Sequence, residues 1–177
     1  TELFYLSQQF GANSHILEEL IDGDDFEDLP HAYVNYGTPE FNRLMRVRFR
    51  VIRAFLEEGN RVISADIDVA WLRSPLHYLS EVLVRYPWAC QTEAVAEFPP
   101  NFCLGFFAAS PTPECFELLD AHIARFGADV KHRHLTQQQL FNRIIRESPG
   151  YLPGIFPLPE ALFANGLLYS AIGSKDA

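Results

Sequence analysis

The chain has 177 residues, which is enough for one domain with a sizeable core, and we expect a single domain over residues 1–177. Hydrophobic residues make up 48% and charged residues 21%, proportions that are ordinary for a globular domain. The net charge of −9 argues against nucleic-acid binding, because phosphate recognition requires clustered Lys and Arg. No run of about eighteen apolar residues is present, so we expect no membrane-spanning segment.

The first elements in chain order are a strand and two helices. We expect a short strand over residues 1–6 and a short helix over residues 13–21, where a polar cap precedes apolar residues at helical spacing. The clearest helix of the chain covers residues 38–59. Thr38 suits its N-cap and Gly59 suits its stop.

Apolar spacing within this long helix defines the face that we expect to be buried. Its members are Phe41, Leu44, Met45, Val51, Ile52 and Phe55. Arg48 falls on the same face, so two interpretations are open. It is either a snorkelling arginine at the edge of the apolar stripe or a cation projected into a functional site.

Strand and helix patterns alternate along the rest of the chain. The expected strands cover residues 61–66, 87–93 and 102–110. The expected helices cover residues 112–127 and 136–147, each preceded or begun by a capping threonine. Alternation of this kind is typical of an α/β domain, so we expect a mostly parallel sheet.

Two carboxylates follow the first of these strands, in the stretch "RVISADIDVAWLRSPL". Side chains at i and i+2 of a strand point to one side, so Asp66 and Asp68 converge if the extended geometry continues. Neighbouring carboxylates repel unless a cation or hydrogen-bond donors compensate them, and Mg²⁺ and Mn²⁺ prefer oxygen ligands. The pair therefore predicts a metal that carries a diphosphate. The alternative is that Asp66 caps the next turn and Asp68 is solvated.

Four motifs in order carry a resemblance to a known family. A helix with Arg48 is followed by "DIDV" with Trp71, Leu72, Arg73 and Pro75, then by "CLGFFAASPT", "QQQLFN" and "FPLPEALFANGLLY". This series, over residues 36–169, resembles the nucleotide-diphospho-sugar transferase family. Its members are GT-A-fold glycosyltransferases that include plant and algal arabinosyl- and xylosyltransferase-like enzymes. The resemblance implies a GT-A-like three-layer α/β fold.

The resemblance also implies a donor site. By analogy with the family, Asp66 and Asp68 bind Mn²⁺ or Mg²⁺ and the diphosphate of a nucleotide-diphospho-sugar donor. Arg48 stands in place of a lysine of the family, near the donor. Gly105 lets the backbone approach the sugar closely, and its alternative role is a bulge in a buried strand.

The helix that begins at "TQQQLFN" supplies the candidate catalytic residues, Gln137 and Gln138. Gln137 stands where the family has an aspartate, and a glutamine cannot act as a nucleophile or base. Gln138 matches the glutamine of the family. The expected sugar or acceptor pocket consists of Thr92, Glu93, Cys103 and Asn142, with Cys103 in place of the family's asparagine.

The expected activity is metal-dependent transfer of a sugar to a glycan or glycoprotein acceptor, in the Golgi lumen if the resemblance holds. We expect the chain to be truncated at both ends relative to the family pattern. Gln137 leaves open the alternative of a degenerate GT-A-like domain without turnover. A metal-dependent hydrolase of phosphate esters would need more carboxylates than the sequence places here. His132 and His134 are expected to be surface residues rather than metal ligands.

Overall fold

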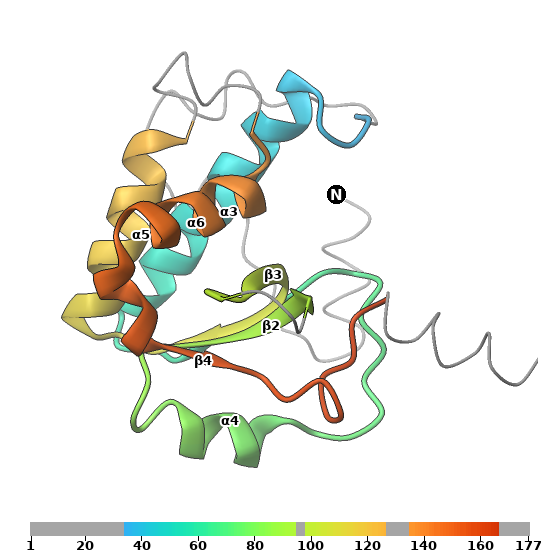
Figure 1. The fold of residues 1–177 in the computed structure, drawn as a ribbon, viewed down its shortest axis with the longest axis vertical. Coiled ribbons are helices and arrows are strands. Elements are labelled where there is room, and N and C mark those ends of the chain that lie inside the picture. Colours follow the sequence, from blue (N-terminus) through green and yellow to red (C-terminus); the bar gives the residue numbers. More distant parts are fainter. Residues whose placement is uncertain (1–33, 95–97, 127–134, 167–177) are drawn as a thin grey trace, which may run out of the picture.

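The computed structural model describes residues 34–94, 98–126 and 135–166. These residues form a four-stranded sheet in the order β1-β3-β2-β4, with helices on both of its faces (Figure 1). The strands are β1 (Val62–Ala65), β2 (Trp88–Ala94), β3 (Asn101–Ala109) and β4 (Ile155–Pro157). The helices are α3 (Pro39–Glu57), α4 (Leu76–Val82), α5 (Pro113–Arg125), α6 (Gln137–Glu147) and the 3₁₀ helix η2 (Pro149–Gly154). The strand and helix predicted over residues 1–21 lie outside the described part.

The prediction of a mostly parallel sheet is wrong, because the sheet is mixed. β3 pairs antiparallel with both β1 and β2, while β2 pairs parallel with β4. Only residues 95–100 separate β2 from β3, whereas a parallel crossover needs about a dozen residues or more. The short connection therefore forces β3 to run back beside β2. The predicted α/β class and the three layers are both found.

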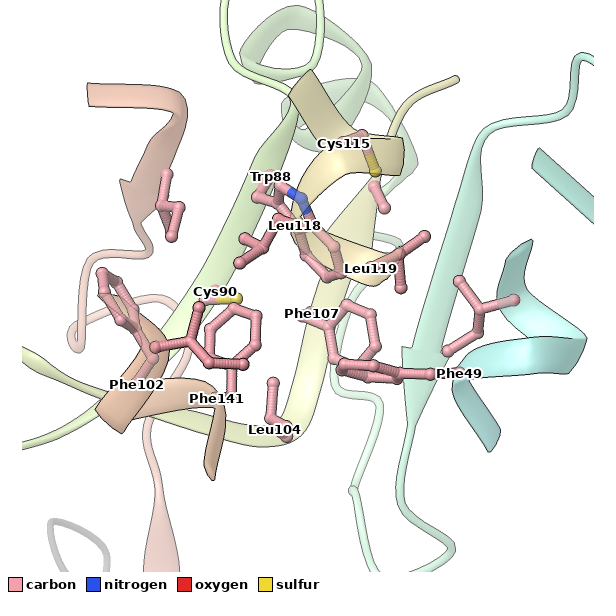
Figure 2. Packing of buried hydrophobic residues seen from close by; sticks show 14 of the residues in the cluster. Phe49, Trp88, Cys90, Phe102, Leu104, Phe107, Cys115, Leu118, Leu119 and Phe141 are labelled. Atoms are coloured by element: carbon pink, nitrogen blue, oxygen red, sulfur yellow. The ribbon is translucent and has the colours of Figure 1, made fainter. Parts of the chain in front are cut away.

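Two apolar clusters cover the two faces of the sheet. The larger joins β2 and β3 to α3, α5 and α6, and Figure 2 shows Phe49, Trp88, Phe107 and Phe141 packed at its centre. The smaller joins the opposite face to α4 and to Leu158. The helices α3, α5 and α6 accordingly lie on one side of the sheet and α4 on the other (Figure 1).

The ends of the three long helices follow the predicted capping residues. The hydroxyl oxygen of Thr38 accepts a hydrogen bond from the backbone N–H of Phe41, and Thr112 and Thr136 cap α5 and α6 in the same way. Thr136 and Gln139 form a reciprocal capping box. Gly59 follows α3 with a φ of 83°, a left-handed conformation that glycine adopts without strain. Helix α4 was not predicted from the sequence.

The buried face of α3 differs from the face that the spacing predicts. Phe49, Ile52 and Leu56 are the residues of α3 that are buried in the larger cluster, and Phe49 and Leu56 were not among the predicted members. Apolar residues occur on several sides of this helix, so periodicity alone does not select one face. The helix contacts β1, α5 and α6, and these contacts decide which residues become buried.

Candidate functional site

The acidic pair lies where β1 ends and the chain turns. The backbone N–H of Asp66 still donates to the carbonyl oxygen of Gly105, at 2.8 Å, but the N–H of Val69 already donates to the carbonyl oxygen of Asp66. The extended geometry therefore stops at Asp66, and the pair is placed by a turn rather than by a continued strand. Asp68 is exposed, and the Asp66 side chain is half-exposed.

Arg48 reaches this turn from α3, and of its two interpretations the structure favours the cation that projects toward the acidic pair. Its guanidinium contacts Asp66 Oδ1 at 2.9 Å and donates to the hydroxyl oxygen of Ser64. It also donates to the carbonyl oxygen of Leu104, at 2.8 Å, and lies 5.5 Å from the ring centroid of Phe107. Arg48 therefore joins the acidic pair to β3 instead of extending into solvent.

The charge on Asp66 is only partly compensated. Burial raises the pKa of the Asp66 carboxyl, the Arg48 guanidinium opposes that rise, and the charge of Asp68 adds to it, so the pKa stays above its ordinary value. A further cation near the two carboxylates would stabilise both charged forms. The oxygen donors fit a hard divalent ion whose remaining ligands are waters and phosphate oxygens. Among the described residues, no group of three or more His, Cys, Asp or Glu side chains is arranged to hold a metal ion. A metal at the acidic pair would therefore need waters and phosphate oxygens as further ligands.

A bulge in β3 places Gly105 beside Asp66. The register passes from Cys90 opposite Phe107 directly to Gln91 opposite Cys103, so the residues from Leu104 to Phe106 have no counterpart in β2. A Cβ atom added at Gly105 would lie 3.3 Å from Asp66 Oδ2 and 3.3 Å from Cys103 Sγ. A side chain at this position would therefore press on the carboxylate.

Replacing Gly105 with Ala is expected to displace the Asp66 carboxylate and to lower the free energy of unfolding by about 1 kcal/mol, because the added methyl group overpacks the bulge. The matched control is Gly150→Ala, where an added Cβ meets no atom within 4 Å. Urea denaturation of the two variants measures the difference. An equal change in both would show that Gly105 is not constrained by Asp66.

Glu93, Gln138 and Cys103 complete the group around the bulge. The side-chain amide of Gln138 accepts from the N–H of Leu104 at 3.0 Å and donates to Glu93 Oε1 at 2.7 Å. The Cys103 sulfur accepts from the N–H of Gly105 at 3.4 Å, and burial raises the pKa of this thiol. The structure thus brings together six of the predicted site residues, namely Arg48, Asp66, Gly105, Glu93, Cys103 and Gln138, with Asp68 on the adjoining turn.

The other three predicted residues have different surroundings, and of these Asn142 also touches the group, because its amide donates to the carbonyl oxygen of Gln138 at 3.0 Å. Thr92 is buried on β2, where its hydroxyl donates to Glu160 at 3.3 Å. The amide of Asn142 is buried and pairs with both the N–H and the carbonyl of Phe102, each at 2.7 Å. Gln137 is only 4% exposed, so its side chain lies in the protein interior. His132 and His134 lie outside the described residues.

Ser64 and the Leu104 peptide belong to the site and were not predicted. Ser64 precedes Asp66 by two residues on β1, so the period of a strand places it on the same side. That spacing was a usable signal for Ser64. The role of Leu104 depends on its backbone, which a residue type does not reveal.

Comparison with known proteins identifies the family of this chain. The chain belongs to the nucleotide-diphospho-sugar transferase family, whose model matches residues 2–169. It is 31% identical over 100 residues to the β-arabinofuranosyltransferase RAY1 of Arabidopsis thaliana. The aligned stretch covers 52% of this chain and 19% of that protein. It is 24% identical over 156 residues to the arabinosyltransferase XEG113 of the same plant. This second aligned stretch covers 80% of this chain and 22% of that protein.

The chain therefore spans about a fifth of the length of these curated relatives. No solved structure matches it. Among the helices that the structure describes, none has the length and apolarity needed to cross a membrane.

Proposed function

We propose that the chain transfers an arabinosyl group from a nucleotide diphosphate donor to a hydroxyl group of a glycan or glycoprotein, with Mn²⁺ or Mg²⁺ held by Asp66 and Asp68. The observation that carries the proposal is the placement of Asp66 and exposed Asp68 on the turn that ends β1, with Oδ1 of Asp66 held by Arg48, in a member of this family. The names of the two relatives support arabinose as the transferred sugar.

The reaction breaks the bond between the anomeric carbon and the diphosphate oxygen, which leaves with the electron pair, and the acceptor oxygen forms the new bond and gives up its proton to the departing diphosphate or to water. A divalent ion supplies a Lewis acid that stabilises the departing diphosphate. The chain's own residues orient and polarise this region. Arg48 fixes Oδ1 of Asp66, exposed Asp68 is accessible to a ligand, and Gly105 leaves room for Asp66 Oδ2.

Transfer of radiolabelled sugar to a glycan acceptor tests the proposal. We expect a nucleotide-diphosphate arabinose to serve as donor, and Asp68→Ala to lower its turnover at least ~100-fold because a metal ligand is lost. The control is Asp120→Ala, which removes a carboxylate that pairs with Arg53 on the surface of α3 and α5. Equal turnover in the Asp68 and Asp120 variants would contradict the assigned role of Asp68.

A second candidate is donor binding without turnover. It is favoured by buried Gln137, at the position where the family has an acid, and by the absence of a third metal ligand among the described residues. Donor binding in calorimetry, combined with no sugar release or transfer over hours, would support this candidate. Measurable transfer would exclude it. The Golgi location stays a prediction.

A further inference from the structure

The β3 bulge leaves the backbone N–H and carbonyl of Leu104 without partners in β2, and two side chains satisfy them. In a regular strand the N–H and carbonyl of Leu104 would pair with neighbouring strands, but the bulge removes the partner in β2. Gln138 of α6 accepts from the N–H, and Arg48 of α3 donates to the carbonyl. Two helices therefore hold the backbone of one residue, one through its N–H and the other through its carbonyl, and this residue immediately precedes Gly105.

Gln138 performs a task that requires one side chain to carry both an acceptor and a donor. Its oxygen accepts from the Leu104 N–H while its nitrogen donates to Glu93, so it must be acceptor and donor at once. Glu93 is oriented in turn, because its other oxygen accepts from the Asn101 amide at 3.0 Å. The carboxylate of Glu93 thus fixes which way the Gln138 amide points.

The same group of contacts continues to the acidic pair. Arg48 joins the Leu104 carbonyl to Asp66 Oδ1, and the next peptide supplies the Gly105 carbonyl that accepts from the Asp66 N–H. The position of Asp66 is therefore set by β1 and by the bulge together. Any change that lets the bulge relax moves the carboxylate.

We infer that Glu93 and Gln138 are positioning residues that hold the Leu104–Gly105 bulge, and through it the Asp66 carboxylate, in the geometry needed for the diphosphate. This inference rests on the proposed function for the role of Asp66. It assigns Gln138 to the support of the site and not to the reacting atoms. Its structural part concerns the bulge alone and is testable without any donor.

A charge swap distinguishes this arrangement from simple packing. Gln138→Glu places two carboxylates at a contact of 2.7 Å and removes the donor, so it breaks the pair. Glu93→Gln combined with Gln138→Glu restores every bond with the polarity of the pair reversed. The amide introduced at position 93 donates to the carboxylate introduced at position 138 and accepts from Asn101, and that carboxylate still accepts from the N–H of Leu104. Gln139→Glu is the matched control, because it adds the same charge at the next, exposed position of α6.

Amide hydrogen exchange in the absence of ligand is the first readout. We expect Gln138→Glu to accelerate exchange of the Leu104 and Asp66 amides by roughly tenfold or more, since a hydrogen bond within a charged network is lost. The double variant should return both amides to within about threefold of the parent, and Gln139→Glu should leave them unchanged. Unchanged exchange in Gln138→Glu, or no recovery in the double variant, would overturn the inference. If Gln138→Glu alone does not fold, a folded double variant with exchange rates close to those of the parent supports the inference, and an unfolded double variant overturns it.

Calorimetry with a nucleoside diphosphate and Mn²⁺ is the second readout. The affinity should fall in Gln138→Glu and recover in the double variant, which a purely structural role for Gln138 does not require. An affinity that is equal in the parent and Gln138→Glu would contradict the link to Asp66. Absence of nucleotide binding in the parent would refute the proposed function, and the exchange result would then still decide whether Glu93 and Gln138 hold the bulge.

Discussion

Replacing Arg48 with Met is expected to lower the free energy of unfolding by about 3 kcal/mol, because its guanidinium serves three partners in a partly buried setting. The Arg48 side chain is 19% exposed and contacts Ser64, Asp66 and the Leu104 carbonyl. Removing it leaves a half-buried carboxylate without its cation and a carbonyl without its donor, and each loss is costly. Methionine keeps most of the side-chain length, so the change measures the guanidinium rather than packing.

Arg53→Met on the same helix is the control. Arg53 pairs with Asp120 and Glu57 at the surface, where ion pairs contribute about 1 kcal/mol or less. Arg48→Lys should fall between the two, because lysine keeps the charge but lacks the planar fork that serves several acceptors at once. Urea denaturation of the three variants gives the comparison. Equal losses in the free energy of unfolding for Arg48→Met and Arg53→Met would show that the buried contacts of Arg48 stabilise the fold no more than the surface ion pairs of Arg53.

The second large effect is a loss of stability in mild acid that originates at His122. This residue of α5 is 1% exposed, and its Nε2 contacts the carbonyl oxygen of Gln137 at 3.0 Å. Its Nδ1 has no hydrogen-bond partner among the described residues. Burial lowers the pKa of His122 from 6.5 to about 4, because the charged imidazolium is poorly solvated in the core.

The sign of the effect follows from proton binding. Above pH 6.5 both the folded and the unfolded chain hold a neutral His122, so this residue does not affect the balance. As the pH falls from 6.5 toward 4, the unfolded chain binds the proton first and unfolding becomes more favourable. The total loss is roughly 3 kcal/mol once the pH reaches the folded pKa.

His122→Leu should remove this part of the pH dependence. Urea denaturation at pH values of about 7 and about 4.5 should show the parent losing at least ~2 kcal/mol more than the variant over that interval. At neutral pH the variant should lose about 1 kcal/mol, because the Gln137 carbonyl loses the hydrogen bond from Nε2 while leucine fills the space lined by Phe49 and Phe126. The same pH dependence in parent and variant would place the acid lability elsewhere.

The features that were predicted correctly from the sequence are those fixed by local chemistry. Thr38, Thr112 and Thr136 mark helix starts because a hydroxyl next to free N–H groups acts within one turn. The two interpretations of Arg48 came from its place in the apolar spacing of one helix, and its contact with Asp66 favours the cation projected into a site. Each of these signals is contained in a short stretch of the chain.

The features that were missed depend on contacts between distant segments. The direction of β3 follows from a short connection that the alternation pattern obscured. A bulge at Gly105 was one of two interpretations of that residue, but the contacts of Leu104 with Gln138 and Arg48 beside it were not visible in the sequence. Gln138 was predicted as a catalytic residue from its match to the family, and its bond to the backbone N–H of Leu104 is an additional finding.

Calorimetric titration of a nucleoside diphosphate, with and without Mn²⁺, tests the central proposal most directly. Two protein carboxylates complete a metal shell only with phosphate oxygens and waters, so we expect Mn²⁺ to strengthen nucleotide binding at least ~10-fold in the parent. In Asp68→Ala this strengthening should disappear while the unfolding transition is retained, because Asp68 is exposed and contributes little to the core. Nucleotide affinity that is the same with and without Mn²⁺ in the parent would contradict the assignment of Asp66 and Asp68 as a metal and diphosphate site.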